Sequence, residues 1–201
     1  MKNYLTSLYG QSSEICPAED NSWNLKILTM DYSIREAGLS DIQTIRDIAD
    51  IAFRATYASI ISPGQIDFML DWMYSEDTLA REMSSGVNYL LLVCDGKAVA
   101  YVSFGPEDKA QSGLSSGVLY HLHKIYILPE FQSRGFGRVL FAAAEACMRK
   151  RGAIAFELNV NRSNPALGFY ERMGMHISRS GDFYIGNGFF MNDYIMRKEL
   201  G

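Results

Sequence analysis

The chain has 201 residues, and its 48% hydrophobic and 21% charged residues are typical of a globular domain with a buried core. Its 19 basic and 23 acidic residues give a net charge of −4, which argues against a nucleic-acid partner, because nucleic-acid binders are usually basic. No stretch reaches the roughly 18 apolar residues of a membrane span, and residues 1–23 lack the apolar segment of a secretory signal. We therefore expect a cytoplasmic protein without a membrane or nucleic-acid partner.

The cysteines also favour a cytoplasmic protein. Cys16, Cys94 and Cys147 are widely spaced and fit no metal-binding or redox motif, so the sequence predicts no metal site. Cys94 falls in a strand-like segment and Cys147 in a helical one, which favours buried free thiols over functional ones. Free thiols are typical of a reducing, cytoplasmic setting.

The first 29 residues differ from the rest of the chain. Residues 1–29 are polar and weakly patterned, and we expect them to form an extension outside the core fold. Two interpretations stay open: the extension is an ordered arm, or Met30 is the functional start of the protein. Residues 30–201 are expected to form a single domain, since one domain is the default for this length.

The first half of this domain predicts one strand, three helices and a hairpin. Tyr32–Glu36 is typical of a strand, and residues 40–43 match a capping box that would open a helix with an apolar face. Ser62 and Ser75 are expected to cap two further helices. Residues 89–104 predict a β-hairpin that turns at Asp95-Gly96, and the Gly/Ser-rich residues 106–117 predict a loop.

The second half continues the alternation of strands and helices. We expect strands at 119–128, 155–160, 176–185 and 190–197, and helices at 138–151 and 165–173. Either Ser163 or Asn164 is expected to cap the helix at 165–173, with Pro165 in its first turn.

The segment between the strand at 119–128 and the helix at 138–151 carries the most specific signal. Gly135 and Gly137 let the backbone approach a ligand closely, and the first N–H groups of a helix have no partner within it. Arg134 and Arg138 add cationic groups suited to phosphate. Because the helix dipole adds positive charge at this end, the segment predicts a pyrophosphate site.

Two common phosphate-binding patterns are excluded. Nothing fits G-x-x-x-x-G-K-[ST], and Leu140 stands where a dinucleotide fingerprint needs its third glycine. What remains, Q-x-x-G-x-G at residues 132–137, resembles motif A of the GNAT N-acetyltransferase superfamily. Residues 161–175 resemble the N-x-x-A-x-x-F-Y-x-x-x-G-F block of the same family, with Ser163 in place of the usual Asn and Met175 in place of the final Phe. The resemblance covers about residues 32–200.

This resemblance implies an α/β protein with the GNAT fold, whose mixed, mostly antiparallel central sheet has splayed central strands and is flanked by helices. It implies acetyl-CoA (coenzyme A) as the cofactor. The binding residues that it implies are Ile125, Tyr126 and Ile127 along the pantetheine arm, Gln132, Ser133, Arg134, Gly135, Phe136, Gly137 and Arg138 at the diphosphate, and Ser163. The resemblance also implies a β-bulge in the strand at 119–128 that would aim one backbone N–H at the thioester oxygen, with Ile127 as our candidate for that N–H.

Acetyl transfer to an amine also needs a base and an acid, because an amine with a pKa of about 10.4 must lose a proton before it attacks. His121 and His123 occupy alternate positions of one strand and so face the same side. Either is a candidate base, with His123 slightly ahead, unless both are structural or surface residues. The resemblance implies Tyr170 as the acid for the departing thiolate, and the alternative is a core aromatic residue.

The C-terminal segment 181–196 narrows the class of acceptor that we expect. Together with residues 52–57 it resembles the PaiA-type branch, which implies a small-molecule amine acceptor such as spermidine or spermine. The alternatives are a protein or peptide N-acetyltransferase acting on Lys or an N-terminal amine, and a non-catalytic acyl-CoA-binding sensor. Candidate substrate-facing acids are Asp67, Asp71, Glu76 and Asp77, although a solvated helix face is the favoured interpretation. Family members often pair through their C-terminal strands, which leaves a homodimer open.

Overall fold

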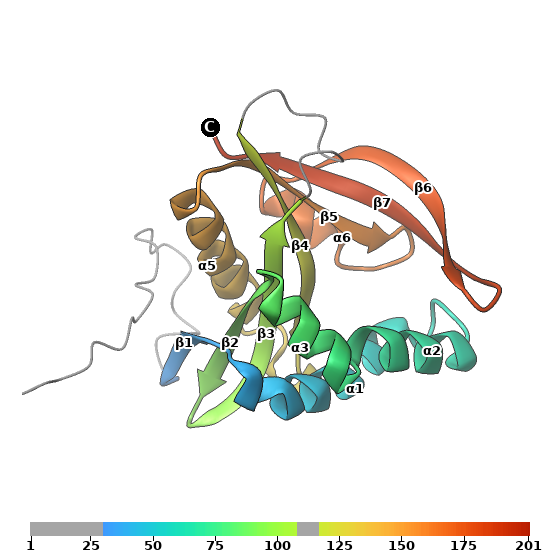
Figure 1. The fold of residues 1–201 in the computed structure, drawn as a ribbon, viewed down its shortest axis with the longest axis horizontal. Coiled ribbons are helices and arrows are strands. Elements are labelled where there is room, and N and C mark those ends of the chain that lie inside the picture. The colour runs from blue at the N-terminus through green and yellow to red at the C-terminus, as the bar shows by residue number, and fades with distance from the viewer. Residues whose placement is uncertain (1–29, 108–116) are drawn as a thin grey trace, which may run out of the picture.

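A computed structural model of the chain describes residues 30–107 and 117–201. The expected N-terminal extension and most of the expected loop at 106–117 lie outside the described residues. In chain order the elements are β1 (Tyr32–Glu36), a 3-10 turn (Leu39–Asp41), α1 (Ile42–Tyr57), α2 (Pro63–Tyr74), α3 (Glu76–Ser84), β2 (Asn88–Cys94), β3 (Lys97–Pro106), β4 (Val118–Ile127), a 3-10 turn (Pro129–Phe131), α5 (Phe136–Lys150), β5 (Ala153–Asn161), α6 (Leu167–Arg172), β6 (His176–Gly186) and β7 (Phe189–Glu199) (Figure 1).

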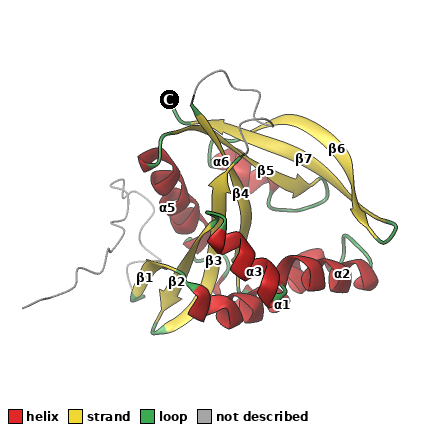
Figure 2. Cartoon of the chain, viewed as in Figure 1, coloured by secondary structure: helices red, strands yellow, loops and turns green. Residues whose placement is uncertain are grey.

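These strands form one seven-stranded sheet in the order β1-β2-β3-β4-β5-β7-β6. Every neighbouring pair is antiparallel except β4 and β5. Helices flank the sheet (Figure 2), with α1 packed against β3 and β4 on one face and α5 packed against β4 and β5 on the other. We call these the α1 face and the α5 face. The predicted mixed, mostly antiparallel sheet with flanking helices is confirmed.

The two central strands separate along their length. β4 pairs with β5 only from Val118 to His121, opposite Ala153 to Glu157. Beyond these residues β4 continues beside β3 alone, and β5 continues beside β7. The predicted splay is therefore present, and it leaves one edge of β4 without a neighbouring strand from Leu122 onward.

A β-bulge in β4 changes which side chains share a face. Lys124 lies opposite Ser103 and Leu122 lies opposite Phe104, so His123 is the extra residue. The bulge falls four residues before Ile127, our candidate for the backbone N–H donor. As a consequence the side chains of Lys124 and Tyr126 lie on the α1 face, as do those of His121 and His123. The ring centroids of the two histidines are 5.0 Å apart.

The helix starts agree with the sequence in part. The hydroxyls of Ser62 and Ser75 accept hydrogen bonds from the N–H groups of Gln65 and Thr78, as predicted for helix caps. The predicted capping box at residues 40–43 was wrong, because the Asp41 carboxylate bonds the N–H of Gly38 and closes a 3-10 turn before α1.

The two later helices start at other residues than we predicted. α5 starts at Phe136, two residues before Arg138, and α6 starts at Leu167, two residues after Pro165. The turn before α6 is closed by Asn164, whose side chain accepts from the N–H of Ala166. Ser163 is exposed and instead donates its N–H to the side chain of Asn161.

The predicted hairpin and the strands of the second half are confirmed within a few residues at their ends. Cys94 and Cys147 are buried free thiols, as predicted, and Cys16 lies outside the described residues. No helix in the described part of the chain combines the length and the apolar character needed to cross a bilayer.

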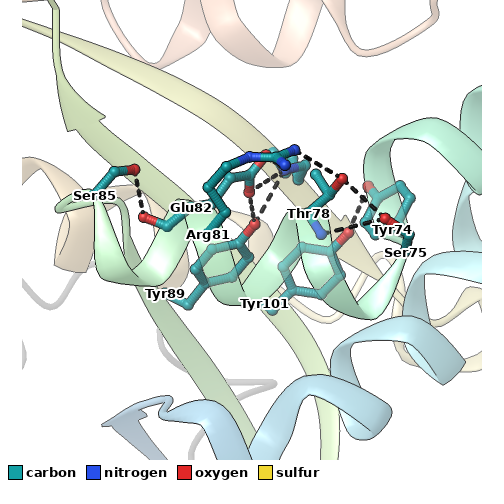
Figure 3. Close-up of polar contacts among 9 residues, drawn as sticks. Tyr74, Ser75, Thr78, Arg81, Glu82, Ser85, Tyr89 and Tyr101 are labelled. Carbon is teal, nitrogen blue, oxygen red and sulfur yellow. Dashed lines mark hydrogen bonds and ion pairs between the residues drawn. The ribbon is translucent and has the colours of Figure 1, made fainter.

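A buried ion pair holds α3 to the sheet. The Lys124 ammonium, whose side chain is 4% exposed, bonds the two Glu82 carboxylate oxygens at 2.8 and 2.6 Å and the Tyr89 hydroxyl oxygen at 3.0 Å. Tyr89 in turn donates to Glu82, and beside them Tyr101 donates to the Tyr74 hydroxyl at 2.7 Å (Figure 3). Burial lowers the pKa of Lys124, and the carboxylate of Glu82 opposes this shift.

We expect Glu82→Gln to lower the free energy of unfolding by about 3 to 5 kcal/mol, because it leaves the buried ammonium of Lys124 without its anion. The double variant Glu82→Leu/Lys124→Met removes both charges and should lose much less. Urea denaturation measures both, with the exposed Glu76→Gln on the same helix as the control. Equal losses for the single and double variants would contradict this account of the pair.

Candidate active site

The loop between β4 and α5 presents a run of unpaired backbone N–H groups. Within the described residues, no hydrogen bond uses the N–H of Ser133, Arg134, Gly135, Phe136 or Gly137. Gly135 caps the helix with φ of 92° and Ser133 has φ of 59°, so both adopt the left-handed conformation. Left-handed residues bend the backbone into concavities lined by N–H groups, and a helix N-terminus adds partial positive charge. The loop therefore has the properties of an anion site.

At the two ends of the predicted loop the backbone N–H groups already have hydrogen-bond acceptors. The N–H of Gln132 donates to Pro129 and that of Arg138 to Gly135. The Gln132 side chain donates to the carbonyl oxygen of Ile127 at 3.1 Å, which ties the loop to the end of β4. The Arg134 guanidinium donates to the carbonyl of Glu130 at 2.8 Å and lies over the ring of Phe131.

The open edge of β4 follows from its pairing with β3. The N–H of Leu128 donates to the carbonyl of Val99, so in this antiparallel pair Tyr126 also bonds β3. Alternate residues turn their backbone groups the other way, so the N–H groups of Ile125 and Ile127 point toward the side that β5 leaves open. The backbone of Tyr126 faces β3 and its side chain lies on the α1 face.

Gly137 allows the first turn of α5 to approach this edge closely. A Cβ atom on Gly137 would lie 3.4 Å from Cδ1 of Ile127 and 3.6 Å from the ring of Phe169. The anion loop, the open edge of β4 and α6 therefore meet at one place.

The two predicted histidines lie together on the α1 face. Nδ1 of His121 is 2.9 Å from a carboxylate oxygen of Glu107, and this contact lowers the pKa of Glu107. A carboxylate at Nδ1 orients the ring and leaves Nε2 as the proton acceptor. Desolvation, followed by the charges of His121 and Lys124, lowers the pKa of His123 to about 3. The His123 side chain is nevertheless exposed, so solvent screening offsets part of this shift.

Tyr170 lies in a cluster of tyrosines near the place where β4 and β5 separate, which we call the opening. Its residue is 8% exposed, and burial, followed by the nearby Tyr57, raises its pKa, so the hydroxyl keeps its proton at neutral pH. Tyr126 on β4 and Asn164 before α6 lie near the Tyr57 hydroxyl, and both lower its pKa, although burial raises that pKa overall. Tyr57 therefore lies between β4 and the chain that precedes α6.

Three polar residues at the opening were missed as site residues. Tyr57, Glu107 and Asp193 come from α1, the end of β3 and β7. Tyr57 and Asp193 fell within segments that we noted only for their resemblance, and Glu107 fell in a predicted loop. Only their contacts with sequence-distant groups distinguish them from ordinary core or loop residues.

The acidic residues that we had considered on α2 and α3 lie apart from this cluster. Asp67, Asp71, Glu76 and Asp77 are all exposed, and Asp67 pairs with Arg54 at 2.7 Å. Asp71 lines a surface hollow of about 470 Å³ between α1 and α2, together with Asp47 and Asp50. This agrees with the favoured interpretation of a solvated helix face.

Comparison with known proteins gives a consistent result. Residues 45–175 match the model of the acetyltransferase (GNAT) family. The chain is similar to the spermidine N(1)-acetyltransferase of Thermoplasma acidophilum, with 26% identity over 85% of this chain and 98% of that protein. It is also similar to the uncharacterized N-acetyltransferase YuaI of Bacillus subtilis, with 30% identity over 69% of this chain and 77% of the relative.

Among solved structures, the fold is similar to the PaiA N-acetyltransferase of Thermoplasma acidophilum in complex with coenzyme A. The TM-score is 0.69 and the identity is 24%, over 85% of this chain and 99% of that chain.

Proposed function

We infer that this chain, which belongs to the acetyltransferase (GNAT) family and is an N-acetyltransferase enzyme with acetyl-CoA as its cosubstrate, acetylates a primary amine of a small polyamine. The observation that carries the inference is the run of unpaired N–H groups at Ser133–Gly137 beside the open edge of β4. The relative named a spermidine N(1)-acetyltransferase supports the class of acceptor, since the similarity spans nearly all of that protein. Two buried free thiols favour a cytoplasmic setting.

The residues present suit acetyl-CoA. The N–H groups of Ser133–Gly137 would bind its diphosphate, with the dipole of α5 adding favourable charge. The backbone of Ile125 and Ile127 would pair with the pantetheine arm along the edge that β5 leaves open. Bound there, acetyl-CoA supplies the activated acetyl group, and the Ile127 N–H is our candidate to stabilise charge on the carbonyl oxygen.

His121 is the base that the geometry favours. Its Nδ1 is held by Glu107, so Nε2 is directed to accept a proton from the attacking amine, directly or through one water. His123 lies beside it, and its lowered pKa keeps that ring neutral at physiological pH. A neutral neighbour avoids a second positive charge when His121 takes up the proton. This contact with Glu107 is the reason to place His121 before His123.

Tyr170 is the acid in this mechanism. As the new C–N bond forms and the C–S bond breaks, the Tyr170 hydroxyl donates its proton to the sulfur of the departing thiolate. Burial raises the pKa of Tyr170, so the hydroxyl is protonated at neutral pH and has a proton to donate. Tyr57 and Tyr126 lie next to it and supply polar groups in an otherwise apolar setting.

The function is tested by thiol release from acetyl-CoA with a panel of acceptors: spermidine, spermine, short diamines, amino acids and Lys-containing peptides. We expect turnover with the polyamines at higher kcat/KM than with any peptide. A higher kcat/KM for a peptide would indicate that the acceptor is a protein and not a small amine. No turnover with any amine, while CoA still binds in calorimetry, would favour a non-catalytic sensor.

We expect Tyr170→Phe to lower kcat by about a hundredfold or more, the usual contribution of a general acid, while the affinity for CoA stays unchanged. Steady-state kinetics and calorimetry measure the two quantities. Tyr120→Phe is the matched control, because Tyr120 is an equally buried phenol on β4. If CoA affinity falls together with kcat, Tyr170 supports the fold rather than the chemistry.

We expect Gly135→Asp to weaken CoA binding by at least about tenfold, because it places a negative charge in the anion loop and strains a left-handed position. Gly152→Asp is the control: it has φ of 80° just beyond the other end of α5, so it introduces the same backbone strain away from the loop. Calorimetry with CoA compares the two variants. Equal affinities would show that the diphosphate lies elsewhere.

A further inference from the structure

Asp193 on β7 is a buried carboxylate with an unpaired oxygen. The residue is 6% exposed, and its Oδ1 has no hydrogen-bond partner within residues 30–107 and 117–201. Burial raises the pKa of Asp193, which reflects the unfavourable desolvation of its charge, and the nearby Asn159 opposes this shift only in part. A buried anion that lacks a counterion is destabilising, so such groups usually bind a cation.

The nearest protein cation does not fill this position. The Arg162 guanidinium is bonded to Asp182 at 2.9 Å and to the carbonyl of Gly181 at 3.1 Å. It also lies over the ring of Tyr194. Because Tyr194 is next to Asp193 in the strand, the Tyr194 side chain points to the opposite face of β7. Arg162 therefore attracts Asp193 only from a distance.

The carboxylate lies on the face that carries the proposed base. Lys198 on β7 bonds Glu145 of α5 at 2.6 Å, so the even-numbered residues near it face α5. Arg197 and Asp193, by alternation, face the other way, and Arg197 bonds Glu157, which pairs with His121 of β4. Asp193 also raises the pKa of Tyr57, so it lies within electrostatic reach of the tyrosine cluster.

The spacing along β5 relates Asp193 to His121. His121 pairs with Glu157, and Asp193 pairs with Asn161, four residues further along the same strand. At about 3.3 Å per residue, the two positions are about 13 Å apart along the strand, and β7 lies two strands from β4 at about 4.8 Å per strand. The two backbone positions are therefore about 16 Å apart. That span is comparable to the length of a linear polyamine and exceeds that of a short diamine.

An aromatic ring covers the residue that lies opposite Asp193 on β6. Asp193 is opposite Gly181 of β6, and a Cβ atom on Gly181 would lie 2.8 Å from the ring of Phe183. The ring of Phe183 therefore folds over Gly181, next to Asp193 on the same face. A carboxylate, the Asn159 amide and a partly exposed ring together form a setting that suits an ammonium group.

We propose that Asp193 binds the ammonium group of a polyamine acceptor that is not acetylated, with Asn159 and Phe183 as additional contacts. This assignment rests on the proposed function. A carboxylate stabilises the charged form of an amine and would oppose the deprotonation that acetyl transfer requires. Asp193 therefore suits the distant nitrogen, and His121 suits the reacting one.

The test compares Asp193→Asn with the wild type using spermidine and propylamine as acceptors. We expect the KM for spermidine to rise by about tenfold to a hundredfold, the usual loss for a hydrogen bond to a charged group, with kcat and the KM for propylamine nearly unchanged. Asp182→Asn, an exposed neighbour on β6, is the control. An unchanged KM for spermidine, or an equal rise for both acceptors, would overturn the proposal.

Two further measurements separate this proposal from the proposed function and from a structural role. Calorimetric titration of spermidine into the CoA complex reports binding even where no acetyl transfer occurs. Thermal unfolding should give Asp193→Asn a Tm equal to or above that of the wild type, because the change removes an unpaired buried charge. A lower Tm, with spermidine binding unchanged, would make Asp193 a structural residue.

Discussion

The separation of β4 from β5 is the constraint on which the rest of the structure depends. A strand in the middle of a sheet normally has both edges hydrogen-bonded, and its backbone is then closed to ligands. Here β4 loses β5 after His121, so the N–H groups of Ile125 and Ile127 lie at an edge inside the protein. The sheet tolerates this because β3 holds the other edge of β4 and β7 holds β5. An interior edge of this kind is a place for an extended ligand to add as a strand.

The bulge at His123 and the close approach at Gly137 adapt the neighbouring elements to that edge. The bulge brings Lys124 and Tyr126 onto the α1 face, where His121 and His123 also lie. Gly137 brings α5 close to Ile127, so the N–H groups that open the helix lie beside the end of the strand. The proposed cosubstrate site thus uses backbone groups at the edge of β4 and the start of α5. The proposed acceptor site uses side chains on the α1 face.

Side-chain networks keep the two halves of the sheet in these positions. The buried pair of Lys124 and Glu82 fixes α3 to β4. On the other half, Glu157 bonds both Arg179 and Arg197, which joins β5, β6 and β7. Tyr57 lies close to Tyr126 of β4 and to Asn164 before α6, so it lies between the two halves. Rigid support of this kind on both sides is what a site between splayed strands needs to hold its groups in place.

The sequence by itself determined the architecture and the family. Periodic apolar residues and turn signals were sufficient for the order of strands and helices, because these patterns depend on contacts close in the chain. The glycine loop and the block around Tyr170 were sufficient for the resemblance to the GNAT superfamily, and that resemblance implied the splay. Element ends were less accurate: α5 begins at Phe136 rather than Arg138, because the left-handed Gly135, and not the arginine, sets the start of the helix.

Only the tertiary structure decided which side chains meet at the opening. The contact between His121 and Glu107, the surroundings of Tyr57 and the burial of the unpaired Asp193 oxygen depend on residues far apart in the chain. Nothing in the local sequence marks Asp193 as buried, since an aspartate in a β-hairpin is usually solvated. The position of the bulge could not be predicted from the sequence either, because it is a difference in register between two strands. Such properties arise from the pairing of strands and the packing of helices on them, and a single segment carries no record of either.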